Sequence, residues 1–191
     1  MSLSSRRRLC HRSRVENPEQ TRDNPSIRLV RLSPDVMQAL VDGDQMAAAE
    51  RSGIAITDYL AGEECGWLWQ MRLEQVAEDP DCARWIARAV VSEPDGTVVG
   101  VAGFHGPPDG SGMVEVGYRV DPAHRRRGYA RAILAELLRW AAAEPDVRTV
   151  RASIRPDNAA SLATIAGFGF ARVGEQWDEI DGLETLFETR T

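Results

Sequence analysis

The chain has 191 residues, a formal net charge of −6, and 43% hydrophobic and 27% charged residues. These values are typical of a soluble globular protein with a sizeable core, and the acidic balance argues against general nucleic-acid binding. All 23 basic residues are arginine, which excludes a Walker-type phosphate loop and a lysine Schiff base.

Cysteine and histidine are sparse. Three scattered cysteines and three dispersed histidines indicate neither a disulfide framework nor a zinc site, so we expect no metal and a cytoplasmic location. No apolar run approaches the roughly 20 residues of a membrane span, and no signal peptide is recognisable. We therefore expect no membrane partner, and the acidic net charge leads us to expect no nucleic-acid partner. The protein could form a homodimer.

The N-terminal segment differs in composition from the rest of the chain. Residues 1–25 are rich in Ser, Arg, Asn and Pro and lack hydrophobic periodicity, which predicts a disordered or loosely attached tail. The arginine cluster at residues 6–8 could anchor an anion, although a solvated tail is the simpler interpretation. Residues 26–191 are expected to form a single domain.

The first predicted strand covers residues 27–32. Ser33 and Pro34 then predict the N-cap and first position of a helix that ends near residues 42–43. A longer helical segment is predicted over residues 57–78. It is interrupted near Gly62 or Gly66. This segment carries three large side chains, Trp67, Trp69 and Met71. Core packing is the favoured interpretation for them over a substrate-pocket wall.

The second half of the chain predicts more strands than helices. Pro94-Asp95-Gly96 indicates a hairpin turn between two of the strands, which argues against a doubly wound sheet because that fold needs a crossover helix there. The predicted strands are 85–91, 98–104, 114–120, 147–154, 170–173 and 183–187, and the predicted helices are 130–141 and 159–166.

The stretch from residue 114 to residue 130 joins a strand to a helix. Apolar residues recur at every second position from 114 to 120, with Glu115 on the opposite face. Asp121-Pro122 ends the strand, because proline has no N–H to donate to a ladder. From Ala130 onward apolar residues recur at i, i+3 and i+4, as on one face of an amphipathic helix.

An arginine-rich loop lies at this strand-to-helix junction. The first turn of a helix has backbone N–H groups without partners and partial positive charge, and Gly128 lets a ligand approach them. The neighbouring guanidinium groups add full charges, and they belong to Arg125, Arg126 and Arg127. These features together predict a diphosphate cradle, with a solvated basic helix start as the alternative.

The pattern Arg125-x-x-Gly128-x-Ala130 resembles the Q/R-x-x-G-x-G/A signature of the GCN5-related N-acetyltransferases, which bind the pyrophosphate of acetyl-CoA. The resemblance runs from about residue 27 to residue 187, and its specific part covers residues 98–170. It implies an α/β fold with a central mixed, partly antiparallel sheet and helices on both faces. Acetyl-CoA is the implied cosubstrate.

A second block of residues resembles the later half of the family's cofactor site. Asn158 begins the predicted helix 159–166 and could cap it, hydrogen-bond the pantetheine chain, or do both. Many family members carry a tyrosine seven positions later to protonate the leaving thiolate, but this chain has Ile165. Ser161, one turn earlier, is similar to the branch that acetylates N-termini of ribosomal proteins, and we assign it the tyrosine's role.

Glu115 is the best candidate for the catalytic base. An amine must be neutral to attack, and free amines are mostly protonated at pH 7, so a carboxylate on the central strand could take the proton directly or through water. Structural ion pairing with an arginine is the alternative. The resemblance implies that a backbone N–H between Tyr118 and Val120 holds the oxyanion.

The expected function is therefore acetyl transfer from acetyl-CoA to a primary amine, on a protein N-terminus or a small molecule, by direct attack in a ternary complex. A non-catalytic acyl-CoA-binding or sensor protein on the same fold is the alternative. Glu115 and Ser161 are the expected catalytic residues. The expected cofactor-binding residues are Tyr118, Val120, Arg125, Arg126, Arg127, Gly128, Tyr129, Ala130, Asn158 and Ser161.

Overall fold

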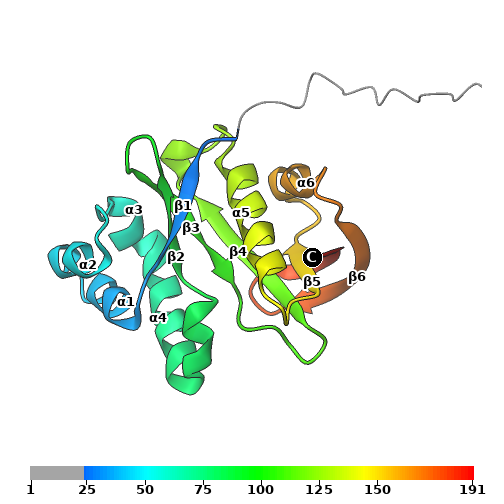
Figure 1. Ribbon diagram of the computed structural model, residues 1–191, viewed down its shortest axis with the longest axis horizontal. Helices are drawn as coiled ribbons and strands as arrows, with labels where there is room; N and C mark the ends of the chain where they lie inside the picture. Colours follow the sequence, from blue (N-terminus) through cyan, green and yellow to red (C-terminus); the bar gives the residue numbers. More distant parts are fainter. Residues whose placement is uncertain (1–23) are drawn as a thin grey trace, which may run out of the picture.

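The structure is a computed structural model that describes residues 24–191 (Figure 1). The tail predicted for residues 1–25 therefore falls outside the described residues, apart from its last two. Within the described part, no helix combines the length and the apolar character that a bilayer span requires.

Seven strands form one sheet in the order β1-β2-β3-β4-β5-β7-β6. Only β4 and β5 are parallel, and every other neighbouring pair is antiparallel. The strands are β1 (Ile27–Arg31), β2 (Arg88–Ser92), β3 (Val98–Phe104), β4 (Met113–Val120), β5 (Thr149–Ile154), β6 (Ala171–Asp178) and β7 (Gly182–Arg190). The predicted mixed, partly antiparallel sheet is confirmed.

Four helices separate β1 from β2: α1 (Pro34–Val41), α2 (Gln45–Ser52), α3 (Asp58–Ala61) and α4 (Glu63–Glu78). The predicted cap of α1 is confirmed, since the Ser33 hydroxyl accepts from the Val36 N–H. Helix α2 is absent from the sequence prediction because it has no apolar stripe. Only Ala48 is buried in it. Its Asp44 N-cap was the available local signal.

Gly62 separates α3 from α4, as expected. A Cβ at this position would lie 2.6 Å from the carbonyl oxygen of Asp58, so the close backbone approach requires glycine. Beyond this break, Trp69 is fully buried and its Nε1 donates to the Leu60 carbonyl at 2.8 Å. Trp67 is 51% exposed. Core packing is therefore correct for Trp69 and wrong for Trp67.

Three strand boundaries differ from the prediction by three residues or more: the start of β2, the end of β6, and the end of β7 at Arg190. Strand β2 begins at Arg88 instead of residue 85, because Ala87 takes a positive φ of 49° and a 3₁₀ turn covers Pro80–Arg84. Strand β6 continues to Asp178, so the β6–β7 hairpin is longer than expected. The Asp178 carboxylate accepts the N–H groups of Ile180 and Asp181, and these bonds close the turn.

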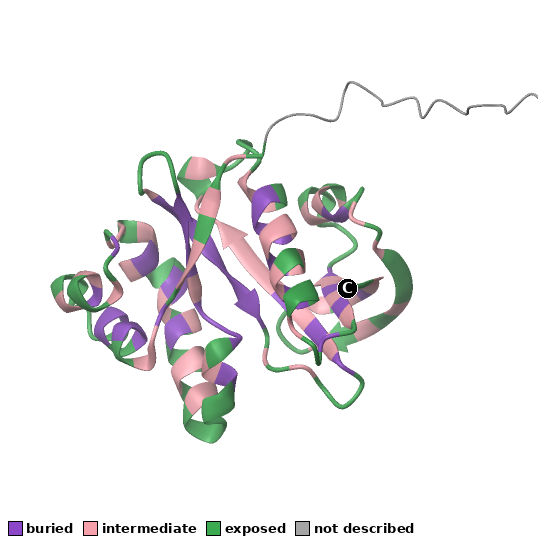
Figure 2. Cartoon of the chain, in the orientation of Figure 1, coloured by how far each residue is buried: buried purple, intermediate pink, exposed green. Residues whose placement is uncertain are grey.

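Helix α5 (Tyr129–Ala143) packs its predicted apolar face on the sheet. Ile133, Leu134 and Leu137 are fully buried, as is Val150 of the parallel strand β5. Burying such side chains contributes about 1.5–3 kcal/mol each. Figure 2 shows this buried surface on α5 and the central strands. The packing of α5 on the sheet fixes the position of β4. In the chain, α5 is followed by β5 and the short helix α6 (Ala159–Ile165).

Candidate active site

The central strands β4 and β5 separate part-way along their length. Their register pairs only Met113–Glu115 with Thr149–Arg151, although β4 continues to Val120. The rest of β5 remains paired with β7. A cavity of about 940 Å³ opens where the two strands part, and both strands line it, β4 with residues 115–119 and β5 with residues 152–154.

The free edge of β4 presents backbone N–H groups to this opening. The His105 N–H donates to the Glu115 carbonyl at 2.8 Å, and the Asp121 N–H also donates to β3. In an antiparallel ladder such bonds recur at alternate residues, so the odd-numbered residues of β4 pair with β3. The N–H groups of Tyr118 and Val120 therefore point toward the β5 side, where the pairing has ended.

The cavity extends to both faces of the sheet. Strand alternation places Glu115 and Arg119 on the face that α4 covers, and Arg119 donates to the Glu64 carbonyl there. Tyr118 lies on the opposite face, toward α6, and Ser161 of α6 lines the same cavity. A ligand approaching from either face can therefore reach the same opening between the strands.

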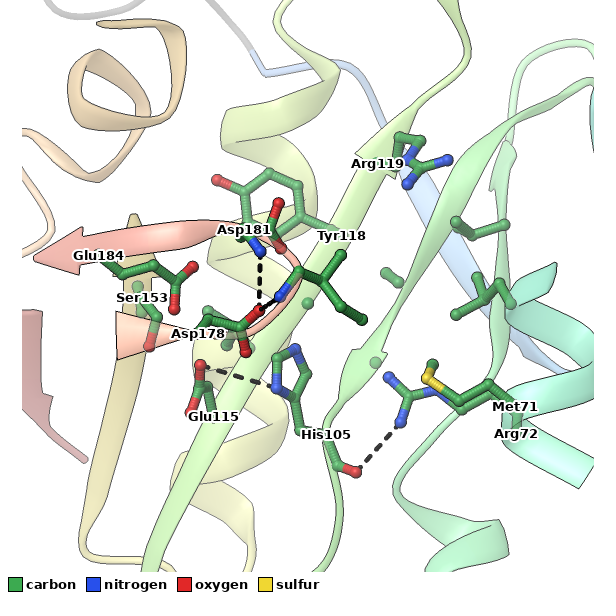
Figure 3. Close-up of a pocket in the computed structure, with 18 of the residues that line it drawn as sticks. Met71, Arg72, His105, Glu115, Tyr118, Arg119, Ser153, Asp178, Asp181 and Glu184 are labelled. Carbon is green, nitrogen blue, oxygen red and sulfur yellow. Dashed lines mark hydrogen bonds and ion pairs between the residues drawn. The ribbon is translucent and has the colours of Figure 1, made fainter. Parts of the chain in front are cut away.

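Glu115 lies beside a histidine. Its carboxylate Oε1 is 3.6 Å from Nδ1 of His105, and the Glu115 side chain is only 19% exposed. Figure 3 shows the two side chains facing one another near the start of β4. Among the described residues, no arginine forms an ion pair with Glu115. Arg151, its register neighbour, pairs instead with Glu188 on β7.

Sequence reasoning did not single out His105. It directly follows β3 and stands in register with Glu115, so the hairpin register was the signal that could have identified it. Burial lowers the pKa of the His105 imidazole, and the positive charge of Arg72 acts in the same direction. The imidazole is therefore neutral at pH 7 and able to accept a proton.

The α6 side of the cavity contains the residues of the second predicted block. Asn158, Ser161 and Ile165 all line the cavity, as their shared helix face implied. The Asn158 side-chain oxygen accepts the Ser161 N–H at 3.0 Å and so caps α6. Tyr118 of β4 lines the same cavity, facing α6. Burial raises the pKa of its phenol, which therefore stays protonated and can donate.

Acidic side chains predominate around the cavity. Figure 3 places the β6–β7 hairpin on one side of it and α4 on the other. Six carboxylates and three guanidinium groups line it: Glu74, Glu78, Glu115, Asp178, Asp181 and Glu184, with Arg72, Arg119 and Arg155. Exposed apolar side chains of Trp67, Met71 and Ile180 stand among them. Sequence reasoning missed this hairpin contribution.

Comparisons of the chain with known protein families and structures agree with this geometry. Residues 18–171 match the family profile described as "Acetyltransferase (GNAT) domain". The chain belongs to the GNAT family. A curated relative from Bacillus subtilis (strain 168), named "Uncharacterized N-acetyltransferase YjdG", is 35% identical over 86 residues. That match covers 45% of this chain and about half (49%) of the relative.

Solved acetyltransferase structures share the fold at low sequence identity. The microcin C7 self-immunity acetyltransferase MccE, solved with acetyl-CoA and AMP, matches with a TM-score of 0.59 and 12% identity, over 88% of this chain and 94% of that one. The ribosomal-protein-S5-alanine acetyltransferase from Vibrio fischeri matches with a TM-score of 0.55 and 16% identity, over 86% and 91%. The predicted GNAT resemblance is confirmed.

The arginine loop of this GNAT chain lies outside the cavity lining. It follows β4 directly, after a 3₁₀ turn at Pro122–His124, and leads into α5. Arg125 Nε donates to the Val120 carbonyl at 3.2 Å, which ties the loop to the end of the strand. No side chain among the described residues caps α5. Its first-turn amides are therefore available to an anion, as a diphosphate requires.

Gly128 has a conformational role in addition to the predicted one. It takes a left-handed φ of 87°, and a Cβ there would lie 3.1 Å from Cδ of Pro25. Glycine therefore permits the turn itself, whether or not a ligand approaches. Arg126 also has a positive φ, 61°, which is unusual for a residue with a side chain. Two left-handed residues in one short loop indicate a specifically folded turn.

Proposed function

We propose that this GNAT protein transfers the acetyl group of acetyl-CoA to a primary amine by direct attack in a ternary complex. The supporting observation is the cavity that passes between β4 and β5. Glu115 lines it on the α4 face, and Asn158 and Ser161 line it from α6. The amine and the thioester can therefore meet at the parted strands from opposite faces of the sheet. Bringing two reactants together in this way removes much of the entropic barrier.

Glu115 is the proposed proton acceptor on the amine side. An α-amino group has a pKa near 7.7–8.0 and a lysine-like amine near 10.4, so both are mostly protonated at pH 7. The amine needs a free lone pair to attack. Glu115 is partly buried, and no arginine of the described chain neutralises it. We propose that it takes this proton, directly or through water.

The backbone amides of Tyr118 and Val120 are the proposed oxyanion donors. Their inferred direction, into the gap between β4 and β5, supports this role because fixed donors need no reorganisation as charge develops. Ser161 is the proposed hydrogen-bond donor to the leaving thiolate, since it lines the cavity beside Asn158. The Asn158 amide N–H₂ group remains to donate to the pantetheine chain while its oxygen caps α6.

The arginine loop is the proposed diphosphate site. The uncapped start of α5 and the guanidinium groups of the loop fit a group with two negative charges. When bound, acetyl-CoA supplies an activated acyl carbon and a thiolate leaving group. The chain would hold it with Arg125, Arg126, Arg127, Gly128, Tyr129, Ala130 and Asn158.

A cationic amine is the proposed substrate class. The cavity carries twice as many carboxylates as guanidinium groups, so it attracts positive charge. Its acidic hairpin side is formed by Asp178, Asp181 and Glu184, while Trp67 and Met71 offer apolar contact from α4. This combination favours an amine with a second positive charge and some apolar surface over a neutral amine.

Release of free CoA thiol tests the function. Acetyl-CoA is incubated with the protein and a panel of N-terminal peptides, polyamines, aminoglycosides and neutral amines, and products are identified by a mass gain of one acetyl group. We expect acetylation of cationic amines and little release without amine. A raised melting temperature with acetyl-CoA, but no release with any amine, would contradict the proposal and favour the acyl-CoA-binding alternative.

A further inference from the structure

His105 is held at its backbone, which leaves its ring for another role. Its N–H donates to the Glu115 carbonyl at 2.8 Å. Its carbonyl accepts from Arg72 at 3.1 Å and from Gln75 Nε2 at 2.6 Å, both on α4 (Figure 3). The backbone is thus fixed from two elements. Apart from Glu115, no described residue forms an ion pair or hydrogen bond with the imidazole.

The imidazole lies between Glu115 and the opening of the strands. Nδ1 faces the Glu115 carboxylate at 3.6 Å, within ion-pair range and longer than a hydrogen bond. Nε2 lies over Gly117, where a Cβ would come within 2.9 Å of it. Gly117 therefore provides the space that the ring occupies. About half of the His105 side chain (53%) is exposed, and it lines the cavity.

Charged groups surround the ring from several elements. Burial and Arg72 of α4 lower the His105 pKa, while Glu115 of β4, Glu184 of β7 and Asp178 of β6 act to raise it. The net effect is that the pKa of His105 is lowered. The neutral ring is thus the state that meets an incoming ammonium group, and the three carboxylates are placed to stabilise the charged ring after it takes a proton.

We propose that His105 is a catalytic residue that receives the amine proton, and that Glu115 acts through it. This inference rests on the proposed function and refines it, because the amine proton goes to His105 instead of to Glu115 directly. Before attack, one N–H bond of the ammonium group breaks and an N–H bond forms at Nε2, which frees the nitrogen lone pair to bond to the acyl carbon. As the C–S bond then breaks, the second proton that the nitrogen loses goes to the departing CoA thiolate. Glu115 balances the imidazolium charge through Nδ1–H. The ring then loses the proton to water through the open side of the cavity.

Kinetics of His105→Ala, compared across pH, test this role. With a high-pKa amine, kcat at pH 7 is expected to fall about 100-fold or more, within the range for general acid–base catalysis, while the acetyl-CoA Kd stays unchanged. The deficit is expected to shrink as pH approaches the amine pKa, and added imidazole should restore part of the rate. Glu188→Gln, at a described position that does not line the cavity, is the control and should keep the wild-type pH profile.

Two further results would separate a proton path from a structural role. If both residues serve one path, the His105→Ala/Glu115→Gln double variant should lose no more than the more damaging single variant. Gly117→Ala should displace the ring and reproduce much of the His105→Ala loss. Independent multiplicative losses, a pH-independent deficit without imidazole rescue, or an equal loss in Glu188→Gln would overturn the proposal.

An NMR titration of the histidine ring separates failure of this inference from failure of the proposed function. The pKa of His105 should lie below that of an ordinary histidine in the wild type, and lower still in Glu115→Gln, because a stabilising negative charge is removed. A His105 pKa that Glu115→Gln does not move would overturn the pairing even in an active enzyme. Wild-type protein that acetylates no amine would overturn the proposed function, and with it the role of His105.

Discussion

Glu115 and Arg151 form the last registered pair between β4 and β5. Arg151 turns to Glu188, its register partner on β7, and forms an ion pair with it. Glu115 is thereby left beside His105, at the point where the parallel strands part. The residue that ends the strand pairing therefore also lines the cavity between the strands.

Replacing Glu115 by Gln tests its role in removing the amine proton. The amide keeps the size of the side chain but can neither take a proton nor stabilise a protonated His105. We expect kcat at pH 7 to fall about 10²–10⁴-fold with acetyl-CoA affinity nearly unchanged, and the loss to shrink at high pH, where the amine is already neutral. Steady-state kinetics between pH 6 and pH 10 measure both effects.

Glu188→Gln is the matched control for Glu115. Like Glu115, Glu188 lies on the sheet. Glu188 forms an ion pair with Arg151 but does not line the cavity. Its removal should change stability by about 1 kcal/mol or less and leave the pH profile unchanged. A deficit in Glu115→Gln that is equal at every pH would instead identify Glu115 as a structural residue.

Substitution of Asn158 separates capping from cofactor contact. Asn158→Asp keeps an oxygen for the Ser161 N–H but removes the amide donor, so stability should be retained while acetyl-CoA affinity falls about 2-fold to 10-fold. Asn158→Ala should lose affinity and also about 1 kcal/mol of stability. Thermal unfolding and acetyl-CoA titration measure the two effects. Full affinity in Asn158→Asp would restrict Asn158 to capping.

Ser161→Ala tests the proposed donor to the leaving thiolate. A thiol pKa near 8.5 means that the leaving group needs little help, so we expect only a 10-fold to 100-fold loss in kcat, about 1.4–2.7 kcal/mol. Acetyl-CoA binding should barely change. Tyr118→Phe is the informative comparison, because its protonated phenol lines the same cavity.

The Ser161 and Tyr118 variants have distinguishable outcomes. A larger kcat loss in Tyr118→Phe than in Ser161→Ala would transfer the donor role to Tyr118. Weakened acetyl-CoA binding in Ser161→Ala with kcat intact would make the serine a cofactor anchor. The variant Ser161→Ala/Ile165→Tyr should recover part of the rate if the new phenol reaches the cavity that Ile165 lines.

The double substitution Arg126→Ser/Arg127→Ser tests the diphosphate site. Each charge-assisted contact that is lost should weaken acetyl-CoA binding about 10-fold or more. Isothermal titration against Arg28→Ser, an exposed arginine on the edge strand β1, provides the control. This test is cleaner than Gly128→Val, which would strain a left-handed turn. Unchanged affinity in the double variant would place the diphosphate elsewhere.

Local patterns predicted much of the fold. The Ser33 cap, the break at Gly62, the apolar face of α5 and the turn at residues 94–96 follow from caps, glycine geometry and hydrophobic period, which act over a few residues. Helix α2 was missed because its only buried residue is Ala48. The arginine loop and the Asn158 block likewise lie in continuous sequence, so the family resemblance was visible there.

The sequence alone determined the order of the strands, the positions of α5 and α6, the GNAT resemblance and Glu115 as a candidate base. The tertiary structure decided which groups meet. Arg72 and His105 are 33 residues apart and are joined only when α4 packs beside the end of β3. The parting of β4 from β5, the position of Trp67 at the cavity and the acidic hairpin depend on long-range pairing in the same way. Such contacts leave no local pattern, because the chain must close long loops before these residues meet.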